Sequence, residues 1–590
     1  MSVLVSKSLR VWMLVVIAVA VASGHPSAAK QSPSHKLDAA LAGLAGTEGH
    51  RARVIIRLRQ GDDASVRDVL RRTQSDIKYE HESISALSVD LPTDSLETLA
   101  NLDEVESLSI DGPVSALATL IPATTGASLR QTLGITSAML LTGRGIGIAV
   151  IDSGISPLPE FGRRIRAFYD FTRGGLATRA YDDYGHGTHV AGLIGGAEAS
   201  SSDSSDVGIA PGVSLIGLKV LDSMGRGYTS DVITAIEFAI ANKRSLGIDI
   251  INLSLGHAPF ESATTDPLVR AVDKASAAGI IVVVAAGNVG ISPTTGLPAY
   301  GGILSPANAR SAITVGSAHT MGTQTRRDDV IGPYSSRGPT WSDGYAKPDL
   351  VAPGHKLLAP VDKYSELPRT NPSLTSGSTY GPTYLTLTGT SMAAAVTSGV
   401  VALVLEANAD AFFSDQSDLT PNVIKAILQY TALPMRDVSG VAYDYMTQGA
   451  GGLNGDGAVD LARAIDTHSK NRYWMVSGIS PVSYIDGSEP WTQFVIWGNN
   501  LVWGDSVQQR LAAWDENVIW GDSIPWENVI WGDNVVWGDN LAWQTNIVWG
   551  DNLIWGENLI WGENLIWGDN LVWGERLDEN VIWGDTIIAW

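Results

Sequence analysis

Three residues that could cooperate in nucleophilic catalysis each lie where one predicted element gives way to another. Asp152 ends the apolar run "IAVID", His186 lies between two glycines in "YGHGTHVAGLIGG", and Ser391 follows "LTGT" at the start of a small-residue stretch. Singly, each has a plain structural interpretation, as a turn carboxylate, a packed loop histidine and a helix N-cap. Together they supply the carboxylate, imidazole and hydroxyl that a serine hydrolase requires.

The chemistry gives each group a task. A hydroxyl is a poor nucleophile at neutral pH, so an imidazole must accept its proton while a carboxylate fixes the imidazole's tautomer. Attack on a carbonyl also creates an oxyanion, which needs hydrogen-bond donors already in place. Asn288, at the end of "VVVAAGN", could donate from an uncharged amide. For an isolated asparagine before Gly290, a turn role is the commoner interpretation.

The elements that must position these residues form one repeating pattern between Gly134 and about Ile465, where short apolar runs alternate with helical patterns. The predicted strands are 146–152, 213–221, 248–256, 280–288 and 312–317. Apolar runs of this kind predict an α/β fold with a doubly wound, mostly parallel sheet and helices on both faces. Functional residues of such folds gather at the C-terminal ends of strands, where Asp152 and Asn288 are expected.

The same residues carry a family resemblance. "VIDSGI", "HGTHVAG" and "GTSMA" resemble the three signature motifs of the subtilase family of serine endopeptidases, in the chain order Asp, His, Ser. "AAGN" is similar to the family's oxyanion-hole segment, and "SSRGPT" and "KPDLVAPG" are similar to its further blocks. Several motifs in order are far more specific than any one of them. The resemblance implies a subtilisin-like fold.

Roles follow from this resemblance residue by residue. It makes Asp152 the residue that orients His186, His186 the general base and acid, and Ser391 the nucleophile. Asn288 and the Ser391 backbone N–H would bind the oxyanion. Other matched segments would line the primary substrate pocket and the edge that pairs with extended substrate; their residues are Ser254, Leu255, Gly256, Ala286 and Gly287 for the pocket, and Gly225 and Gly227 for the edge.

Some residues depart from the family pattern or carry no role in it. Ala395 stands where the family usually has proline, which is expected to alter the helix without abolishing activity. His189 is interpreted as structural, and Asp182 and Asp183 as a solvated acidic turn. No cofactor is expected for catalysis and no metal site is predicted, since the segment 198–208 is Ser-rich where many subtilases hold calcium, so a structural calcium stays unassigned.

The N-terminus and the bulk composition predict an exported protein. Lys7 and Arg10 precede the apolar run "VWMLVVIAVAVA", which is too short to span a bilayer and is followed by small residues, as in a signal peptide. No later stretch predicts a transmembrane anchor. A net charge of −22 argues against nucleic acid as a partner, and the absence of cysteine excludes disulfides and thiol chemistry. The protein is therefore expected to be secreted and extracellular.

A small unit precedes the α/β pattern. Its predicted strands are 53–59, 84–91 and 105–110, and its predicted helices are 64–74 and 94–102, which is an α+β pattern. By resemblance it is an inhibitory propeptide that helps folding and then blocks the cleft. Self-cleavage is expected between about Asp111 and Leu133.

The last hundred residues have a different composition. Sixteen of the 19 tryptophans lie from Trp491 onward, and "NLIWGENLIWGENLIWGDN" repeats every six residues. An even period returns each Trp to one face of an extended chain, so short strands stacked as a solenoid or ladder are predicted. A self-packed array is favoured over an aromatic surface that binds glycans or a cell surface, since exposed tryptophans in such number promote aggregation.

The leading hypothesis is a secreted, self-processed serine endopeptidase acting on protein or peptide substrates, with its own propeptide as inhibitor. The alternative is a surface adhesion or binding protein whose Trp-rich tail carries the main role. An esterase is disfavoured because Ser391 lacks the G-x-S-x-G context. The predicted segments are the signal peptide 1–29, propeptide-like domain 50–112, linker and processing region 113–132, peptidase domain 133–468, linker 469–490 and β-rich repeat tail 491–590.

Overall fold

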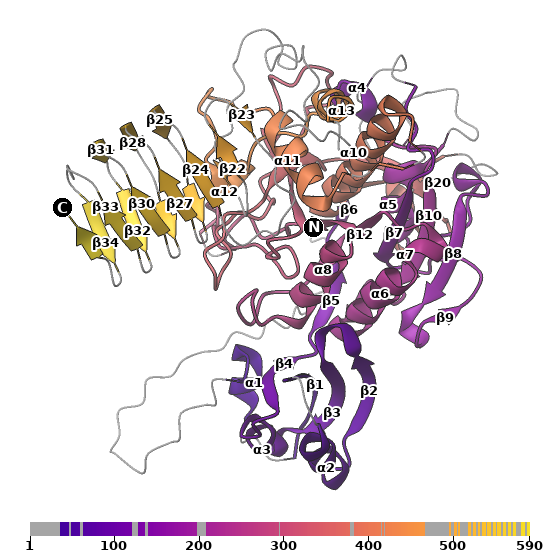
Figure 1. Ribbon diagram of the computed structural model, residues 1–590. Coiled ribbons are helices and arrows are strands. Elements are labelled where there is room, and N and C mark those ends of the chain that lie inside the picture. Colours follow the sequence, from indigo (N-terminus) through magenta and orange to yellow (C-terminus); the bar gives the residue numbers. More distant parts are fainter. Residues whose placement is uncertain are drawn as a thin grey trace, which may run out of the picture.

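The computed structural model describes residues 36–45, 49–59, 63–120, 128–135, 140–197, 208–293, 295–377, 383–414, 416–417 and 419–465, and the backbone of short strands between 495 and 589 (Figure 1). The predicted signal peptide and the linker 469–490 lie outside the described residues. So do residues 198–207 of the Ser-rich segment.

The N-terminal unit is an antiparallel sheet of four strands in the order β2-β3-β1-β4, with short helices packed beside it. Its elements are α1 (Ala39–Leu44), β1 (Arg51–Leu58), α2 (Ala64–Arg72), β2 (Asp76–His81), β3 (Ala86–Pro92), α3 (Leu96–Ala100) and β4 (Val105–Ile110). Val54 and Ile56 of β1 pack with Leu96 and Leu99 in its core. The edge strand β2 was not predicted, because its sequence "DIKYEH" is polar.

The central sheet has nine strands in the order β16-β15-β14-β12-β7-β10-β8-β9, with β17 also paired to β15. The pairs of its central strands are parallel, and β9 and β16 add antiparallel edges. The predicted parallel sheet is therefore confirmed. Its strands are β7 (Gly147–Asp152), β8 (Ile165–Asp170), β9 (Leu176–Ala177), β10 (Ser214–Lys219), β12 (Ile250–Leu253), β14 (Ile281–Ala285), β15 (Ile313–His319), β16 (Val330–Ile331) and β17 (Leu350–Pro353).

Helices cover both faces of this sheet, and alternate residues of β7 face different cores. Ile148 and Val150 belong to the cluster formed with α5 (His186–Gly195), α10 (Thr390–Ala411), α11 (Pro421–Thr431) and α13 (Gly455–Arg463). Ala149 and Ile151 belong to the cluster formed with α6 (Thr229–Ala241) and α8 (Pro267–Ala277). A strand buried on both sides explains why the sequence shows apolar runs rather than alternation.

α10 runs through the first of these cores. Among the described residues it is the one helix long and apolar enough to cross a membrane, with a mean hydropathy of 1.6, yet that window is 100% buried in the protein. A core helix passes the same test of length and composition. Its first residue is Thr390, so the nucleophile candidate Ser391 lies in its first turn.

Two smaller sheets incorporate the segment predicted as a linker. β5 (Pro113–Ala116) lies between β11 (Arg226–Tyr228) and β13 (Leu255–Gly256), antiparallel to both. β6 (Thr119–Leu120) pairs with β20 (Thr383–Thr388), which also pairs with β18 (Leu357–Val361) and β19 (Thr375–Gly377). The composition of 113–120 suggested a loop, but its backbone is held by the edges of neighbouring strands.

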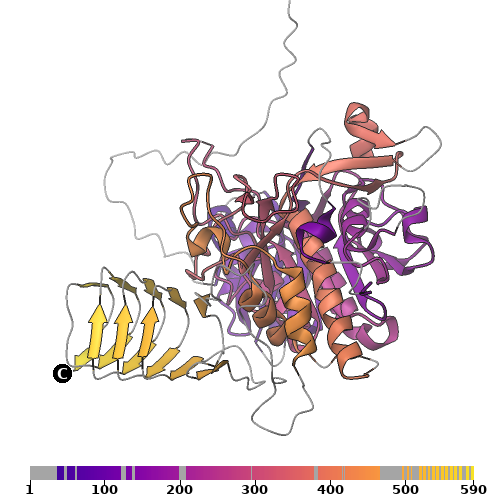
Figure 2. The ribbon, with the colours of Figure 1, turned by 90° about the horizontal axis from the view of Figure 1, so that it is seen from above.

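The tail contributes strands β21 (Val495–Ile496) to β35 (Ile587–Ala589), most of them parallel to one another and shown in yellow in Figure 2. They form three sheets, and a strand pairs with the one three repeats later. In one sheet Trp537 is in register with Trp555, and Trp555 with Trp573. The register therefore sets the same position of repeats that are three periods apart side by side.

Candidate active site

Asp152 and His186 form a buried hydrogen-bonded pair. Asp152 is the last residue of β7, and its Oδ1 accepts a hydrogen bond from Nδ1 of His186 at 2.8 Å. The Ser153 backbone N–H donates to the same oxygen at 2.7 Å. Both side chains are inaccessible to solvent. A carboxylate in this position holds the imidazole in the tautomer that leaves Nε2 to act as a base.

Glycines allow the start of α5 to approach the end of β7. Gly185, the residue before the helix, has φ of 105°, a conformation that favours glycine. A Cβ at Gly187 would collide with the backbone of Gly154, just beyond Asp152. The two glycines that flank His186 are therefore needed for different reasons. Gly185 adopts a backbone conformation that favours glycine, and Gly187 leaves room for the backbone of Gly154.

The interpretation of Asp182 as a solvated turn residue is wrong. Asp182 is 4% exposed and accepts hydrogen bonds from the backbone N–H groups of Tyr184, Gly185 and Thr188, and from two hydroxyls. Burial raises its pKa despite these donors. Asp183, by contrast, is half-exposed and pairs with Lys219 at 2.6 Å. Asp182 thus fixes the loop that delivers His186, which its polar sequence context did not reveal.

Ser391 lies at the same edge of the sheet. Its Oγ donates to the carbonyl of Ser254 at 2.9 Å, and Ser254 Oγ donates to the Ser391 carbonyl at 2.9 Å. Ser254 directly follows β12, which pairs with β7. Leu253 at the end of β12 is in register with Ile151 of β7, the residue before Asp152. The N-cap residue of α10 is Gly389, so the N-cap interpretation of Ser391 is wrong.

The link between His186 and Ser391 is not formed in this structure. Among the described residues, Nε2 of His186 has no hydrogen-bond partner, and the Ser391 hydroxyl is directed to Ser254 instead. Catalytic hydrogen bonds are often long or misaligned before the reaction complex forms. Ala395, where the resemblance leads to proline, is buried within an unbroken α10.

Asn288 points its amide at another part of the chain. Its Nδ2 donates to the carbonyl of Leu117 at 2.8 Å. Its Oδ1 accepts from the backbone N–H of Thr390 at 3.0 Å and from Thr390 Oγ1 at 3.1 Å. Thr390 therefore sets which end of the amide faces Leu117. Sequence reasoning gave Thr390 no role, although it belongs to the quoted motif "GTSMA".

Five of the seven predicted substrate-binding residues lie against the segment 113–117. β5 pairs with Arg226–Tyr228 on one side and Leu255–Gly256 on the other. Ala286 and Gly287 follow β14, and Gly287 has φ of 118°. Gly225 and Gly227 approach Tyr184 and the backbone of Val220 so closely that a Cβ would collide. The structure therefore brings Gly225, Gly227 and residues 254–256 against the segment 113–117, through main-chain pairing and hydrogen bonds.

His189 is a structural residue. Its Nε2 lies 3.1 Å from the Leu357 carbonyl and 3.0 Å from the Leu385 carbonyl, which ties α5 to β18 and β20. Burial lowers its pKa to about 3, so it is neutral and donates. Within the described ranges, no cluster of three or more His, Asp or Glu side chains is arranged to hold a metal ion.

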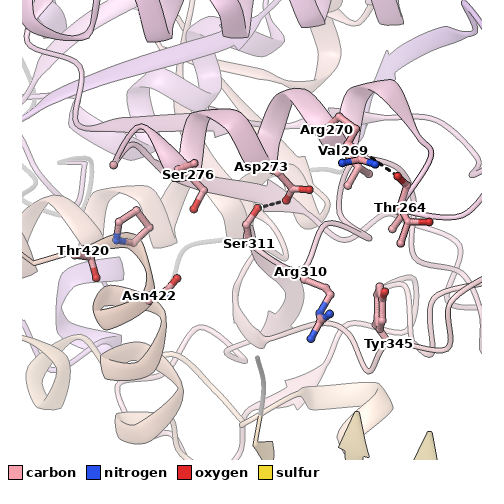
Figure 3. Close-up of a pocket in the computed structure, with 14 residues that line it drawn as sticks. Thr264, Val269, Arg270, Asp273, Ser276, Arg310, Ser311, Tyr345, Thr420 and Asn422 are labelled. Carbon is pink, nitrogen blue, oxygen red and sulfur yellow. Dashed lines mark hydrogen bonds between the residues drawn. The ribbon is translucent and has the colours of Figure 1, made fainter. Parts of the chain in front are cut away.

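A cavity of about 660 Å³ lies elsewhere, beside α8, Tyr345 and the start of α11 (Figure 3). Ser311 Oγ donates there to Asp273 Oδ1 at 2.6 Å, and burial raises the pKa of Asp273. None of the candidate catalytic residues lines this cavity. The candidate active site therefore lies at the C-terminal ends of the central strands and not in this cavity.

The doubly wound fold, with Asp152, His186 and Ser391 at the C-terminal ends of its strands, is subtilisin-like. The Subtilase family model matches residues 143–462, more than half of the chain. The chain belongs to this family of serine proteases, and the predicted enzyme class is confirmed.

Individual relatives are also proteases or are related to subtilisin. Serine protease AprX of Bacillus subtilis is 34% identical over 392 residues, which are 65% of this chain and 81% of AprX. M-protease of Shouchella clausii is 32% identical over 60% of this chain and 77% of its own length. Fervidolysin from Fervidobacterium pennivorans, a keratinolytic enzyme related to subtilisin, aligns with a TM-score of 0.54 at 21% identity, covering 70% of this chain and 62% of its own, less than two thirds. At that identity the likeness shows the fold.

Proposed function

We propose that this chain is a secreted serine endopeptidase, made as a preproprotein, which hydrolyses peptide bonds through Asp152, His186 and Ser391. The observation that carries the proposal is the 2.8 Å hydrogen bond between Asp152 Oδ1 and His186 Nδ1, at the strand edge that also holds Ser391. Export is supported by the N-terminal sequence, in which a basic flank precedes a short apolar run.

In the proposed reaction, the Ser391 hydroxyl turns from the Ser254 carbonyl toward Nε2 of His186. The imidazole accepts its proton as Oγ attacks the substrate carbonyl, and Asp152 stabilises the positive charge that forms. The Asn288 amide and the Ser391 backbone N–H bind the oxyanion. His186 then donates the proton to the leaving amine, and water releases the acyl group by the same route. No cofactor takes part in these steps.

Residues 50–112 are proposed to be the inhibitory propeptide. His81 Nδ1 lies 3.1 Å from a carboxylate oxygen of Glu237 in α6, and Ser83 donates to the other from its N–H at 3.1 Å and its hydroxyl at 2.6 Å. Tyr79 donates to Asp231 at 2.9 Å. Charge-assisted hydrogen bonds of this kind favour a propeptide that stays bound after cleavage.

The tail is proposed to be a self-packed repeat array whose acidic residues keep it soluble. The support is the register of its strands, which stacks equivalent repeat positions. Between 491 and 590 there are 15 Asp and Glu residues against two Arg. Contact with glycans or a cell surface has no comparable support, although it remains the other outcome of the retention experiment described below.

The direct experiment compares the wild type with Ser391→Ala after expression of the full chain. The wild type is expected to release a fragment of propeptide size and to hydrolyse casein, whereas Ser391→Ala remains full-length and inactive. Trimming of purified Ser391→Ala at the wild-type rate would contradict self-processing. Casein hydrolysis by that variant would contradict the role of Ser391.

A further inference from the structure

The segment 113–120 crosses the candidate active site as an extended chain. On its N-terminal side, Gly227 of β11 is in register with Val114, and Leu255 of β13 with Ala116. The Ala116 N–H donates to the Gly225 carbonyl at 3.1 Å, and the Leu117 N–H to the Ser254 carbonyl at 3.4 Å. Pairing on both sides holds the chain through main-chain hydrogen bonds, which suits substrates of varied sequence.

The carbonyl of Leu117 lies where the proposed reaction develops negative charge. It accepts the 2.8 Å hydrogen bond from Asn288 Nδ2, whose other end is fixed by Thr390. A Cβ added to Gly389 would collide with this carbonyl oxygen and lie 3.1 Å from Cα of Ala118. The bond between Leu117 and Ala118 therefore passes directly over the residues that lead into Ser391.

The chain continues past this point as a strand paired to β20. Thr119 is in register with Thr388, and Leu120 with Leu387, in the strand that ends just before Gly389. Main-chain pairing thus holds the segment on both sides of Leu117. Three peptide bonds lie between the paired residues Ala116 and Thr119, and among them the Leu117–Ala118 bond has the carbonyl that Asn288 binds.

The side chain of Leu117 is buried beside Gly256 and the side chain of Leu304. Leu117 is 9% exposed, and its Cδ1 lies 3.7 Å from where a Cβ of Gly256 would stand. Leu304 narrows the same space, because its Cβ lies 3.4 Å from the Gly256 position and its Cγ 2.7 Å from the Gly287 position. Because Gly256 and Gly287 have no side chains, there is room here for the side chain of Leu117. Leu304 limits how large a side chain at this position can be.

We propose that the enzyme processes its own chain between Leu117 and Ala118, and that it prefers substrates with a medium-sized aliphatic residue, leucine foremost, before the cleaved bond. This inference rests on the proposed function. Val114, three residues earlier, is fully buried, whereas Ser115 is exposed. The preferred substrate is therefore an extended peptide with aliphatic side chains at the first and fourth positions before the cleaved bond.

The step balances as an ordinary acyl transfer. Ser391 Oγ bonds to the carbonyl carbon of Leu117 while its proton passes to His186, and the carbon–nitrogen bond to Ala118 breaks. His186 protonates the released nitrogen, which becomes the new N-terminal amine of Ala118. Water then gives a proton to His186 and hydroxide to the acyl carbon, and Ser391 recovers its proton as Leu117 leaves as a carboxylate.

The first experiment is intact-mass analysis of the full chain at early times after purification. The first N-terminal fragment is expected to end at Leu117, and its complement to begin at Ala118. A first cut at any other bond would overturn the inference while leaving the proposed function in place. If Ser391→Ala is cut as the wild type is, the self-processing part of the proposed function fails instead.

Two variants test the pocket within the same chain. Leu117→Glu places a carboxylate in an apolar pocket and should slow the first cut by at least about tenfold relative to Ser115→Glu, which places it on the exposed side of β5. A first cut of Leu117→Glu as fast as that of the wild type and of Ser115→Glu would overturn the assignment. If both variants are processed slowly because they misfold, the peptide assay of the mature enzyme decides, since it uses neither variant.

The mature enzyme can be assayed with peptide anilides that have the sequence Val-Ser-Ala-X. Leucine at X is expected to give a kcat/KM at least about tenfold above glutamate or lysine, and Leu304→Ala should raise the value for phenylalanine relative to leucine. A wild-type preference for a charged residue would overturn the proposed specificity. So would a Leu304→Ala variant with an unchanged ratio of phenylalanine to leucine.

Discussion

Single residues of this site are positioned by neighbours that contribute no chemistry of their own. Asn288 illustrates this, because its Oδ1 accepts two hydrogen bonds from Thr390 and its Nδ2 is thereby aimed at a carbonyl. Asn288→Asp keeps the shape and removes the donor. It is predicted to lower kcat by roughly 10²–10³-fold with a small change in KM, a magnitude that was measured on a subtilisin.

The control for this prediction is Thr390→Val, which removes the hydroxyl bond to Oδ1 and the acceptor of the Gly287 N–H, and keeps the backbone bond to Oδ1. A smaller loss of kcat than for Asn288→Asp is expected, since the amide keeps one of its two anchors. Steady-state kinetics on a peptide anilide supply both numbers. A kcat for Asn288→Asp within about threefold of the wild type would remove Asn288 from the oxyanion site.

His189 predicts a pH dependence of stability. Burial lowers its folded pKa to about 3 from an ordinary 6.5, so the unfolded chain binds the proton more readily. The contribution of neutral His189 to stability is complete above pH 6.5 and is lost as the pH falls toward 3, at up to about 1.4 kcal/mol per pH unit. His189→Gln should show a shallower loss of unfolding free energy between pH 7 and 5.

Urea unfolding in the Ser391→Ala background avoids autolysis and measures both slopes. Other groups titrate in the same range, among them His355, whose pKa burial lowers to about 4. The comparison therefore concerns the difference between the two proteins. Parallel pH profiles for His189→Gln and its parent would refute the assignment of this dependence to His189.

Sequence reasoning selected Asp152, His186 and Ser391 because their residue types, order and element boundaries are unusual together. It misjudged Asp182, whose polar neighbours resemble a solvated turn although five hydrogen bonds hold it in the interior. It also missed Thr390. Residues that act through backbone N–H groups depend on three-dimensional proximity, which one sequence does not display.

At the scale of elements, the five strands β7, β10, β12, β14 and β15 of the central sheet were predicted because each is a mostly apolar run buried on both faces. The other four strands of that sheet, β8, β9, β16 and β17, were missed, and β8 and β9 carry exposed residues. β2 and the paired segment 113–120 were missed as well. The sequence of β2 consists mostly of polar residues. β5 and β6 are strands because distant segments pair with them, namely Arg226–Tyr228, Leu255–Gly256 and Leu387–Thr388. Pairing decided by distant partners leaves little trace in local composition.

A buried ionic cluster joins two elements of the peptidase unit. Asp349, just before β17, pairs with Lys347 at 2.8 Å and with Lys425 of α11 at 2.7 Å. All three side chains are buried, and burial lowers the pKa of Lys347 to about 7. Asp349→Asn leaves two buried lysines without their carboxylate and should cost about 3–5 kcal/mol of unfolding free energy.

The matched control is Asp460→Asn in α13. Asp460 pairs with Arg463 at 3.3 Å, but both side chains are about 40% exposed. An exposed pair of this kind is worth at most about 1 kcal/mol. Urea unfolding of both variants in the Ser391→Ala background should separate them clearly, and similar losses would contradict the structural weight given to Asp349.

At the scale of the whole molecule, the N-terminal unit and the peptidase unit meet through α6. Glu237 accepts three hydrogen bonds from His81 and Ser83. Glu237→Ala is predicted to shorten the lag between self-processing and casein hydrolysis, because the cleaved propeptide dissociates sooner. Asp410→Ala, which removes an exposed carboxylate at the end of α10, provides the control.

Both variants should cut their own chains as fast as the wild type, so the lag isolates propeptide release. Densitometry of the cut reports processing, and casein hydrolysis reports free enzyme. A lag for Glu237→Ala that matches Asp410→Ala would mean that this contact does not control release.

The repeat tail is predicted to be dispensable for peptide hydrolysis. Ending the chain after Pro490 should leave kcat/KM on a peptide anilide within about twofold of the full-length value, because no candidate site residue lies in the tail. Full-length Ser391→Ala should pass through insoluble polysaccharide and cell-wall material without retention. Retention that disappears on truncation would favour a binding tail.

The most direct test of the central claim is labelling by a fluorophosphonate, followed by mass-spectrometric location of the adduct. The wild type should carry one adduct, on Ser391, and His186→Ala should label far more slowly because the hydroxyl has lost its base. An adduct on a different serine, or equal labelling of the wild type and His186→Ala, would contradict the claim that Asp152, His186 and Ser391 act together.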